Sequence, residues 1–517
     1  MPAEAPTIPA LLAHRAATAP GLEAIVDHGG RIDYATLDRR SAERAAWLVT
    51  RGVNKTHCVG LLMENGIGWA INAYAVMRLG AVLVPLSTLL RPNELSAQLG
   101  ISGVRHLIAT ERLRGRDYRA EVGGLDRSLL PSLRTIWWAS ELGSETEGPA
   151  RAVAEALSRR VVPADDMVVI FTSGSRQSPR GVIHTHSAAI RSTAAGAEAR
   201  CVHPGTRLYI PMPFFWVGGF GSGLVTTLVA GATLLTEAVP DPAETLKFLE
   251  RERVTLFRGW PDQAASLARH PAFASTDLSG LTAGSLNPVL PPALQSQPGS
   301  RANLFGMTES FGSYCGYPLD RDMPTSKWGS CGHPFVGIRL RIAEPETGAI
   351  LGPDETGSIQ IGGHNILRGI CGLEREEIFT PDGWYDTGDI GRIDDDGFLW
   401  FNGRRDDMVK VKGATVYPGE VEAALESIPG VARAFATDIT LDGKAAIGAA
   451  VILVRGEVLD TASLAAAAKD RLSAFKLPSR WAILGSVDDL PRNASGKIDK
   501  AGLQALLISS HQDLPPG

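Results

Sequence analysis

The sequence predicts an α/β protein with a large N-terminal domain of α/β subdomains plus a β-rich segment, and a small α+β C-terminal domain. Three observations support this. Helix-period segments alternate with short apolar runs in the first part of the chain, a strand-rich pattern begins near Gly357, and a compact α/β pattern restarts beyond Arg404. With 517 residues, the chain is also longer than one hydrophobic core usually serves.

The alternation is clearest between residues 41 and 99. Ala45, Leu48 and Val49 share one face of a predicted helix, Cys58 to Leu62 form a short apolar run, and Trp69 to Leu79 again follow the helical period. Further strands are expected at Ala81–Pro85, Leu107–Ala109, Val168–Phe171, Leu208–Pro211 and Thr233–Thr236. Because these runs are apolar on both faces, we expect buried parallel strands.

From about Gly357 onward, the sequence pattern changes to short strand-like segments. Ile359, Ile361 and Trp400 lie in short segments between Gly and Asp turns, which is typical of strands. Beyond them we expect helices at residues 420–426 and 464–472 and strands near 431–437 and 446–454. We therefore predict two domains, residues 1–405 and 406–517.

Composition excludes several classes of protein. The chain is 44% hydrophobic and 21% charged, and its net charge of -5 is spread over interspersed acidic and basic residues. No basic stripe is present for nucleic acid and no polybasic segment for an anionic membrane. No integral membrane segment and no signal sequence are expected, so the predicted location is the cytoplasm. The five cysteines are scattered without metal-ligand spacing and predict free thiols.

The first motif with chemical meaning is a loop rich in Ser and Gly. The apolar run Val168–Phe171 leads into Thr172-Ser173-Gly174-Ser175-Arg176-Gln177-Ser178-Pro179-Arg180. Small residues let backbone N–H groups and hydroxyls surround phosphate oxygens. Taken alone, such a loop is better explained as a surface loop after a strand.

Further motifs follow in order. Residues 303–309 read Asn-Leu-Phe-Gly-Met-Thr-Glu, which sets the Thr308 hydroxyl and the Glu309 carboxylate side by side, as suits a phosphate contact and a magnesium ligand. Asp389 ends a Trp-Tyr-Asp-Thr-Gly-Asp turn and is suited to accept hydrogen bonds from two ribose hydroxyls. Gly-Arg-Arg-Asp-Asp at 403–407, a Lys-Gly pair at 412–413 and a loop ending at Lys497 complete the series.

This ordered set resembles the adenylate-forming superfamily of acyl-CoA synthetases, carrier-loading adenylation domains and firefly luciferase, over residues 34 to 500. The chain is most similar to an AMP-forming acyl-CoA ligase. The resemblance implies that a carboxylic acid is joined to coenzyme A through an acyl-adenylate, and that the small C-terminal domain is mobile. The implied cofactors are ATP or acyl-AMP, Mg²⁺ and coenzyme A.

The resemblance also implies roles for single residues. Lys497, Thr308 and Glu309 would be catalytic, Glu309 would bind the metal, Asp406 would be the hinge, and Gly413 would line the coenzyme A tunnel. The implied nucleotide-binding residues are Thr172, Ser173, Gly174, Ser175, Arg176, Gln177, Arg180, Gly284, Ser285, Leu286, Phe305, Gly306, Met307, Thr308, Asp389 and Arg404.

An acyl pocket is implied around Trp216, where many CoA ligases carry His. Its predicted residues are Phe215, Trp216, Gly218, Gly219, Trp260 and Gly306. The aromatic residues favour an apolar acid, polycyclic or aryl. The other interpretation is that these aromatics pack the core, and we favour it for Phe311.

The phosphate loop departs from the family pattern. Arg176, Gln177 and Arg180 stand where the family usually has Thr, Gly and Lys. One interpretation is weakened adenylation, with the enzyme using a preformed acyl-adenylate from a partner adenylating enzyme. The other is that the two arginines hold the β- and γ-phosphates. A stand-alone enzyme that loads a carrier protein and a catalytically silent nucleotide-binding protein are further alternatives, although retained Lys497 and Glu309 favour an enzyme.

Overall fold

The computed structural model describes residues 7–144, 147–172, 179–405, 409–411, 414–416, 418–441, 444–473, 476–492 and 498–509. By its internal contacts the chain forms two compact units, residues 1–339 with 361–385, and residues 340–360 with 386–517. The predicted domain boundary between residues 405 and 406 stays a prediction, because residues 406–408 lie outside the described part of the chain.

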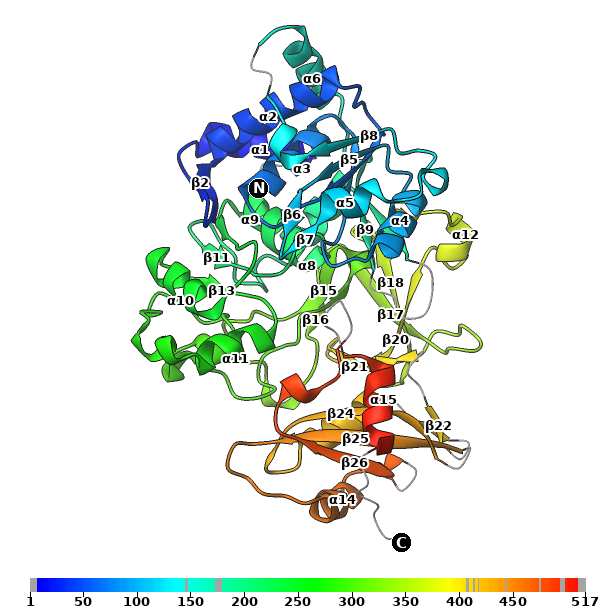
Figure 1. Cartoon of the computed structure of the whole chain (residues 1–517). Helices are drawn as coiled ribbons and strands as arrows, with labels where there is room; N and C mark the ends of the chain where they lie inside the picture. Colours follow the sequence, from blue (N-terminus) through cyan, green and yellow to red (C-terminus); the bar gives the residue numbers. More distant parts are fainter. Residues whose placement is uncertain are drawn as a thin grey trace. The chain divides into compact units, whose positions relative to one another are not determined.

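A seven-stranded sheet lies in the first unit, with the order β19-β10-β9-β4-β3-β5-β8 (Figure 1). Its strands are β3 (Cys58–Leu62), β4 (Val82–Pro85), β5 (His106–Ala109), β8 (Thr135–Trp138), β9 (Asp166–Phe171), β10 (Gly181–Thr185) and β19 (Gly369–Ile370). Strands β3, β4, β5, β8 and β9 pair in parallel, as the apolar runs predicted.

Strand β10 differs, since it pairs antiparallel with β9. A parallel crossover needs a connection of about a dozen residues or more, usually a helix. The connection over residues 172–180 is too short for that, so the chain turns back directly. In the sequence, the predicted phosphate loop therefore lies between two strands that pair antiparallel.

A second sheet of the first unit has the order β13-β11-β12-β1-β2. It contains β1 (Glu23–Asp27), β2 (Gly30–Asp33), β11 (Arg207–Tyr209), β12 (Thr233–Leu235) and β13 (Leu256–Phe257). Strands β1, β12, β11 and β13 are parallel, so their carboxyl ends meet at one edge. Smaller sheets are β14 (Phe305–Met307), β15 (Gly312–Gly316) and β16 (His333–Pro334), and β6 (Arg112–Leu113) with β7 (Arg116–Asp117).

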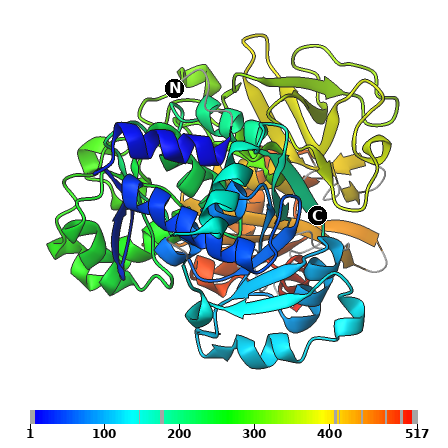
Figure 2. The same cartoon turned by 90° about the horizontal axis from the view of Figure 1, so that it is seen from above.

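Helices cover these sheets. They are α1 (Ile8–Thr18), α2 (Tyr34–Thr50), α3 (Ile67–Arg78), α4 (Pro92–Ile101), α5 (Tyr118–Gly123), α6 (Pro149–Arg159), α7 (His186–Ala195), α8 (Val217–Gly219), α9 (Thr226–Ala230), α10 (Pro242–Arg251), α11 (Pro261–Arg269) and α12 (Arg375–Ile378). The blue helices α1, α2 and α3 lie next to one another in Figure 2 and share one hydrophobic core with β3 and β9. Helix α3 is buried from Trp69 to Arg78, which its apolar sequence explains.

The second unit is described by itself. Most residues of the sheet β17-β18-β20-β21 belong to it, with β17 (Ile338–Ala343), β18 (Gly357–Gly363), β20 (Tyr385–Ile393) and β21 (Leu399–Arg404). A three-stranded sheet contains β24 (Val431–Leu441), β25 (Lys444–Leu453) and β26 (Arg480–Leu484), and α13 (Pro418–Glu426) and α14 (Thr461–Lys469) pack with it. β22 (Val409–Val411), β23 (Ala414–Val416) and α15 (Lys500–Ser509) complete the unit. The predicted helices and strands of this region are confirmed.

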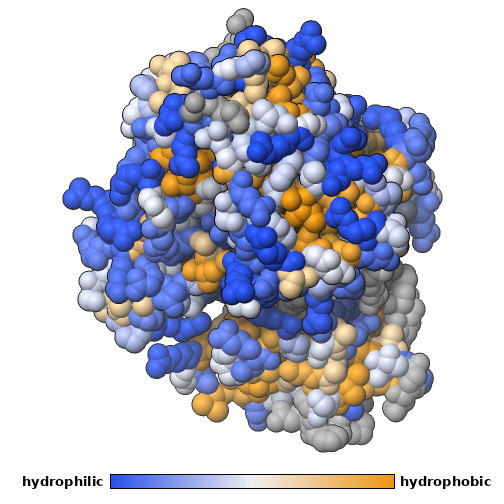
Figure 3. Space-filling model, turned by 45° about the horizontal axis from the view of Figure 1, so that its top comes forward, coloured by the Kyte–Doolittle hydropathy of each residue, from blue (hydrophilic) through white to orange (hydrophobic). Residues whose placement is uncertain are grey.

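The structure bears on two expectations from the sequence, the lack of a membrane segment and the free cysteines. Within the described ranges, no helix has the length and apolar character needed to cross a bilayer. On the face shown in Figure 3, hydrophobic groups are interrupted by hydrophilic residues. All five cysteines carry free thiols, as the scattered spacing predicted.

Candidate active site

A backbone hydrogen bond joins the two ends of the predicted phosphate loop. The N–H of Thr172, just after β9, donates to the carbonyl oxygen of Arg180, just before β10, at 3.1 Å. Thr172 is half-buried and Arg180 is exposed. The predicted residues Ser173, Gly174, Ser175, Arg176 and Gln177 lie outside the described part of the chain.

The Thr308–Glu309 turn is a short 3-10 helix between β14 and β15. Phe311 closes it in the left-handed conformation, with φ at 55°. Glu309 is only 6% exposed, and its carboxylate accepts a hydrogen bond from the Tyr385 hydroxyl at 3.2 Å. Its main-chain carbonyl accepts from the N–H of Leu367 at 2.7 Å. Tyr385 therefore orients the carboxylate, and Leu367 fixes the backbone of the same residue.

His184 of β10 forms a hydrogen bond to the backbone of this turn. Its Nε2 lies 2.7 Å from the carbonyl oxygen of Thr308, and because a carbonyl only accepts, Nε2 carries the hydrogen. The side chain is fully buried, and burial lowers its pKa to about 4, so the imidazole is neutral near pH 7. This bond brings the strand that follows the phosphate loop against the Thr308 turn. We did not predict His184, although a histidine in that strand was a visible signal.

The buried histidines predict how stability depends on pH. Burial lowers the pKa of both His184 and His186 from 6.5 to about 4. Between these values the unfolded chain binds more protons at these two sites than the folded chain, so their contribution to the free energy of unfolding falls as the pH drops from 6.5 to 4 and is constant above 6.5. His184 alone would contribute about 3 kcal/mol to this fall.

Urea unfolding followed by tryptophan fluorescence at a series of pH values measures this effect. The variant His184→Gln keeps a donor for the Thr308 carbonyl but does not titrate, so its unfolding midpoint should vary less with pH than that of the wild type. Equal pH profiles for the two proteins would contradict the prediction.

Gly306 lies at a close approach of β14 to β15. It pairs with Ser313, and a Cβ at this position would lie 2.2 Å from the Gly312 carbonyl oxygen and 2.3 Å from the Ser313 Cα. Phe305 packs its ring edge-on to Tyr314, with ring centres 5.5 Å apart. Only glycine fits at position 306 with this strand spacing, so the residue sets the position of the turn that begins at Thr308.

The predicted adenine segment runs beside the end of β13. Gly284 has φ at 96°, which favours glycine. The buried Ser285 hydroxyl accepts from the N–H of Phe257 at 3.1 Å, and the N–H of Leu286 donates to the Phe257 carbonyl at 3.2 Å. The segment is thereby fixed to the parallel sheet.

The predicted acyl-pocket aromatics form a row. Phe215 and Trp216 have ring centres 5.0 Å apart, and Trp216 and Trp260 have ring centres 5.7 Å apart, both edge-on. Phe215 is buried, whereas Trp260 is 40% exposed. Trp216 and Trp260 come shortly after β11 and β13, at the carboxyl edge of the parallel strands, where open α/β sheets commonly bind ligands.

The segment after Trp216 is irregular and rich in glycine. Gly218 and Gly219 lie in the single turn α8, and a π-helix follows at Phe220–Val225. A Cβ at Gly219 would lie 2.2 Å from the Pro213 carbonyl oxygen. Phe311 is 1% exposed in the main core, with its ring 5.9 Å from that of Phe220, which agrees with our preference for core packing at this residue.

The second unit holds the predicted ribose pair. Asp389 of β20 lies opposite Arg404 of β21, and the Arg404 Nη1 donates to the Asp389 carboxylate at 2.8 Å. Asp389 is 5% exposed and its N–H donates to the Thr387 hydroxyl at 3.1 Å. The two predicted residues are thus brought together. Lys497, Asp406 and Gly413 lie outside the described part of the chain.

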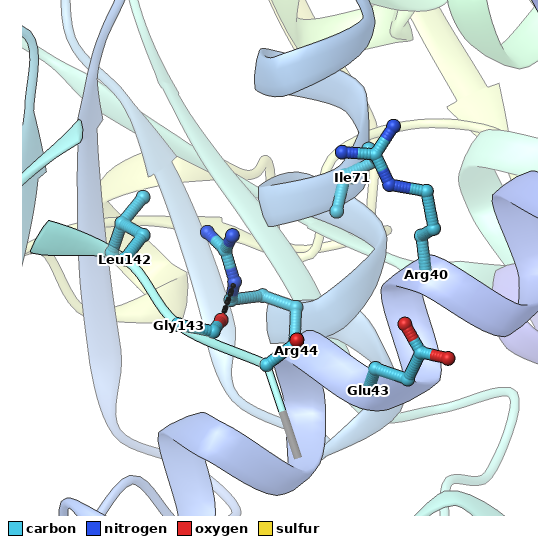
Figure 4. Close-up of a pocket in the computed structure, with 7 residues that line it drawn as sticks. Arg40, Glu43, Arg44, Ile71, Leu142 and Gly143 are labelled. Carbon is cyan, nitrogen blue, oxygen red and sulfur yellow. Dashed lines mark hydrogen bonds between the residues drawn. The ribbon is translucent and has the colours of Figure 1, made fainter. Parts of the chain in front are cut away.

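A separate hollow of about 240 Å³ opens beside α2 (Figure 4). It is lined by Arg40, Glu43, Arg44, Ile71, Leu142, Gly143 and Ser144, none of which was a predicted site residue. Arg44 donates from Nε to the Gly143 carbonyl at 2.8 Å and from Nη1 to the Asn72 side-chain oxygen at 2.6 Å. These bonds tie a loop to α2 and α3, which is a structural role.

Comparison with known proteins supports the first of our functional interpretations. The family model described as AMP-binding enzyme matches residues 12–371. A methyl-dioxo-octahydro-indenyl propanoyl:CoA ligase of Mycobacterium tuberculosis is 32% identical, with 97% of this chain and 99% of that enzyme covered. A feruloyl-CoA synthase of Amycolatopsis is 31% identical, with 94% and 96% covered.

The fold agrees with solved structures as well. ATP-bound MatB from Rhodopseudomonas palustris has a TM-score of 0.77 at 22% identity, with 97% of this chain and 99% of that chain covered. The relatives are ligases, and nothing in the comparisons favours a lost adenylation step or carrier loading. The chain therefore belongs to the family of AMP-binding enzymes, and within it to the AMP-forming acid–thiol ligases of the acyl-CoA synthetase type.

Proposed function

We propose that this enzyme joins a ring-bearing, largely apolar carboxylic acid to coenzyme A in the cytoplasm, through an acyl-adenylate made from ATP. The observation that carries the proposal is the Thr308–Glu309 turn, which His184 holds against the strand leaving the phosphate loop. This contact supports the proposal because it joins the backbone of Thr308 to the strand that follows the predicted phosphate loop.

In the first half-reaction, a carboxylate oxygen of the acid forms a bond to the α-phosphorus of ATP and pyrophosphate leaves. The Thr308 hydroxyl would donate to the α-phosphate, and Lys497 would stabilise charge that develops between the carboxylate and the phosphate. The loop from Thr172 to Arg180 would surround the β- and γ-phosphates, with Arg176 and Arg180 as the cationic groups. Asp389 and Arg404 would bind the ribose.

Glu309 fits a magnesium ligand. No group of three or more His, Cys, Asp or Glu side chains suited to a metal occurs among the described residues. Mg²⁺ commonly takes only one or two protein carboxylates and completes its coordination with water and nucleotide phosphates. The single buried carboxylate of Glu309, oriented by Tyr385, meets that need. When bound, the ion would neutralise phosphate charge.

In the second half-reaction, the thiol of coenzyme A forms a bond to the acyl carbon and AMP leaves. We propose residues 1–405 and 406–517 as the two domains that rearrange between the half-reactions, with Asp406 as the hinge and Gly413 in the tunnel that admits the thiol. A domain rearrangement between the two half-reactions is expected because the adenylation site must exclude water, whereas the thiol must enter the site afterwards.

The acid class rests on Phe215, Trp216 and Trp260 at the carboxyl edge of the parallel strands. Their edge-on contacts offer flat apolar surface, which suits a ring better than a flexible chain. Gly218, Gly219 and Gly306 bring no side chains to this region. Both similar enzymes reported above are named for ring-bearing acyl groups, an indenyl propanoyl and a feruloyl group.

The test separates the two half-reactions. Acid-dependent exchange between pyrophosphate and ATP measures adenylation, and formation of CoA thioester from synthetic aryl-acyl adenylate measures the second step. We expect both with phenylpropanoic acid as the probe and neither with a short linear acid of equal charge. Thioester formation without any pyrophosphate exchange would overturn the proposal that this enzyme makes its own adenylate.

A further inference from the structure

Two arginines of the first unit place positive charge in the protein interior without a carboxylate partner among the described residues. Arg200, which follows α7, is 4% exposed. Its Nη1 and Nη2 donate at 3.4 Å to the carbonyl oxygens of Thr193 and Ser313, and its buried Nε has no partner among the residues that the structure describes. Its guanidinium also lies 5.9 Å from the Phe335 ring centre.

Arg258, directly after β13, likewise has no carboxylate partner in the described chain. Within the described chain, its guanidinium has one hydrogen-bond acceptor, the Gly284 carbonyl oxygen at 2.8 Å from Nη1. Burial lowers the pKa of Arg200 and of Arg258 to about 10, and the charge of Arg258 lowers that of Arg200 further. Buried charges in proteins are normally paired, because removing them from water without a counter-charge is costly.

The side chain of Arg258 is nevertheless not sealed from outside. As a whole residue Arg258 is partly exposed, whereas Arg200 is buried, and no atom of the Arg258 side chain is among the fully buried polar atoms that lack a partner in the described chain. Four of its five N–H donors have no acceptor in the described chain, so it has unused capacity to bind an oxygen.

The position of the two arginines connects them with the acyl and adenylate region. Trp260 lies two residues after Arg258 and contacts Trp216. Gly284 belongs to the predicted adenine segment, and Ser313, which Arg200 contacts, pairs with Gly306. Arg200 is thus bonded to the strand that pairs with Gly306 of the proposed acyl pocket, and Arg258 is bonded to the predicted adenine segment.

We propose that Arg258 determines specificity by binding a second oxygen-bearing group, a carboxylate or a ring carbonyl, at the end of the acyl substrate remote from the reacting carboxylate. This inference rests on the ligase function proposed above. Arg200, almost inaccessible, is a positioning residue that holds β15 and adds to the positive potential. The substrate would then be a ring-bearing acid with apolar faces toward Trp216 and Trp260 and one polar end toward Arg258.

The test uses three acids on the full-length enzyme: phenylpropanoic acid and its para-carboxy and para-acetyl derivatives. For the wild type we expect a lower KM for one or both derivatives than for the parent acid. In Arg258→Met, which keeps the length of the side chain without its donors, this preference should fall by about 10- to 100-fold, mainly through KM for the acid. KM for ATP should not change, and the melting temperature should stay equal or rise, since an unpaired buried charge is removed.

Arg191→Met is the matched control, because Arg191 is an exposed arginine of α7 in the same unit. It should leave all three KM values unchanged, and Arg258→Lys should restore part of the preference. An equal rise of KM for ATP and for all three acids in Arg258→Met would show that Arg258 only supports the adenine segment and would overturn the inference. Turnover of all acids by the wild type without preference would overturn it too, whereas no thioester from any acid would overturn the proposed function itself.

Discussion

Gly306→Ala is expected to abolish adenylation and to destabilise the first unit by about 3 kcal/mol or more. The added Cβ would lie 2.2 Å from the Gly312 carbonyl oxygen and 2.3 Å from the Ser313 Cα. Both obstacles are backbone, so no side chain can rotate away, and β14 must separate from β15. The Thr308 turn would shift with β14, and displacement of a reacting group by about 1 Å costs about 100-fold in rate.

The matched control is Gly369→Ala in β19. A Cβ at Gly369 meets nothing within 4 Å, and its backbone is not left-handed. This variant should keep the pyrophosphate exchange rate and the melting temperature of the wild type. If Gly306→Ala also kept both, the close approach of β14 and β15 would have no bearing on the site.

Glu309→Gln is expected to lower pyrophosphate exchange by about 100-fold or more, with little change in melting temperature. Glutamine has the same shape and can still accept from the Tyr385 hydroxyl, so the turn is retained while the negative charge is lost. The loss should be smaller at high Mg²⁺ concentration, because the proposed role of the carboxylate is to bind the ion.

The variant Tyr385→Phe tests how much the orientation of the Glu309 carboxylate contributes, apart from its charge. It leaves the Glu309 carboxylate intact and removes one hydrogen bond to it, so we expect a much smaller loss, about 10-fold. Exchange assays at several Mg²⁺ concentrations would compare the two variants. A Glu309→Gln enzyme with wild-type exchange at low Mg²⁺ would rule out the metal-binding role.

Much of the fold could be predicted because its signals are local. The helical period around Ala45 and Leu48, the apolar run Cys58–Leu62 and the restart beyond Arg404 each depend on neighbouring residues, and α2, β3 and the second unit follow them. The antiparallel course of β10 could not be read in this way. Its sequence, Gly-Val-Ile-His-Thr, carries no signal of direction, and the short connection from β9 determines the direction.

The site residues also divide into those that local sequence signals indicated and those that only the structure reveals. Thr308, Asp389 and Arg404 lie within short motifs, so the residue order indicated each of them, whereas the structure shows that Asp389 pairs with Arg404. His184 and Tyr385 were missed, although they hold Thr308 and Glu309, because they come from positions 124 and 76 residues away. No local period connects such positions.

The sequence by itself therefore determined the α/β class, the order of the motifs and the ligase family, since these reside in residue types at short spacing. The tertiary structure alone decided which side chains support the Glu309 carboxylate, which glycine allows β14 to approach β15, and that Arg258 lacks a carboxylate partner in the described chain. The physical reason is that hydrogen bonds and charge pairing depend on distance in space, which packing sets between segments far apart in the chain.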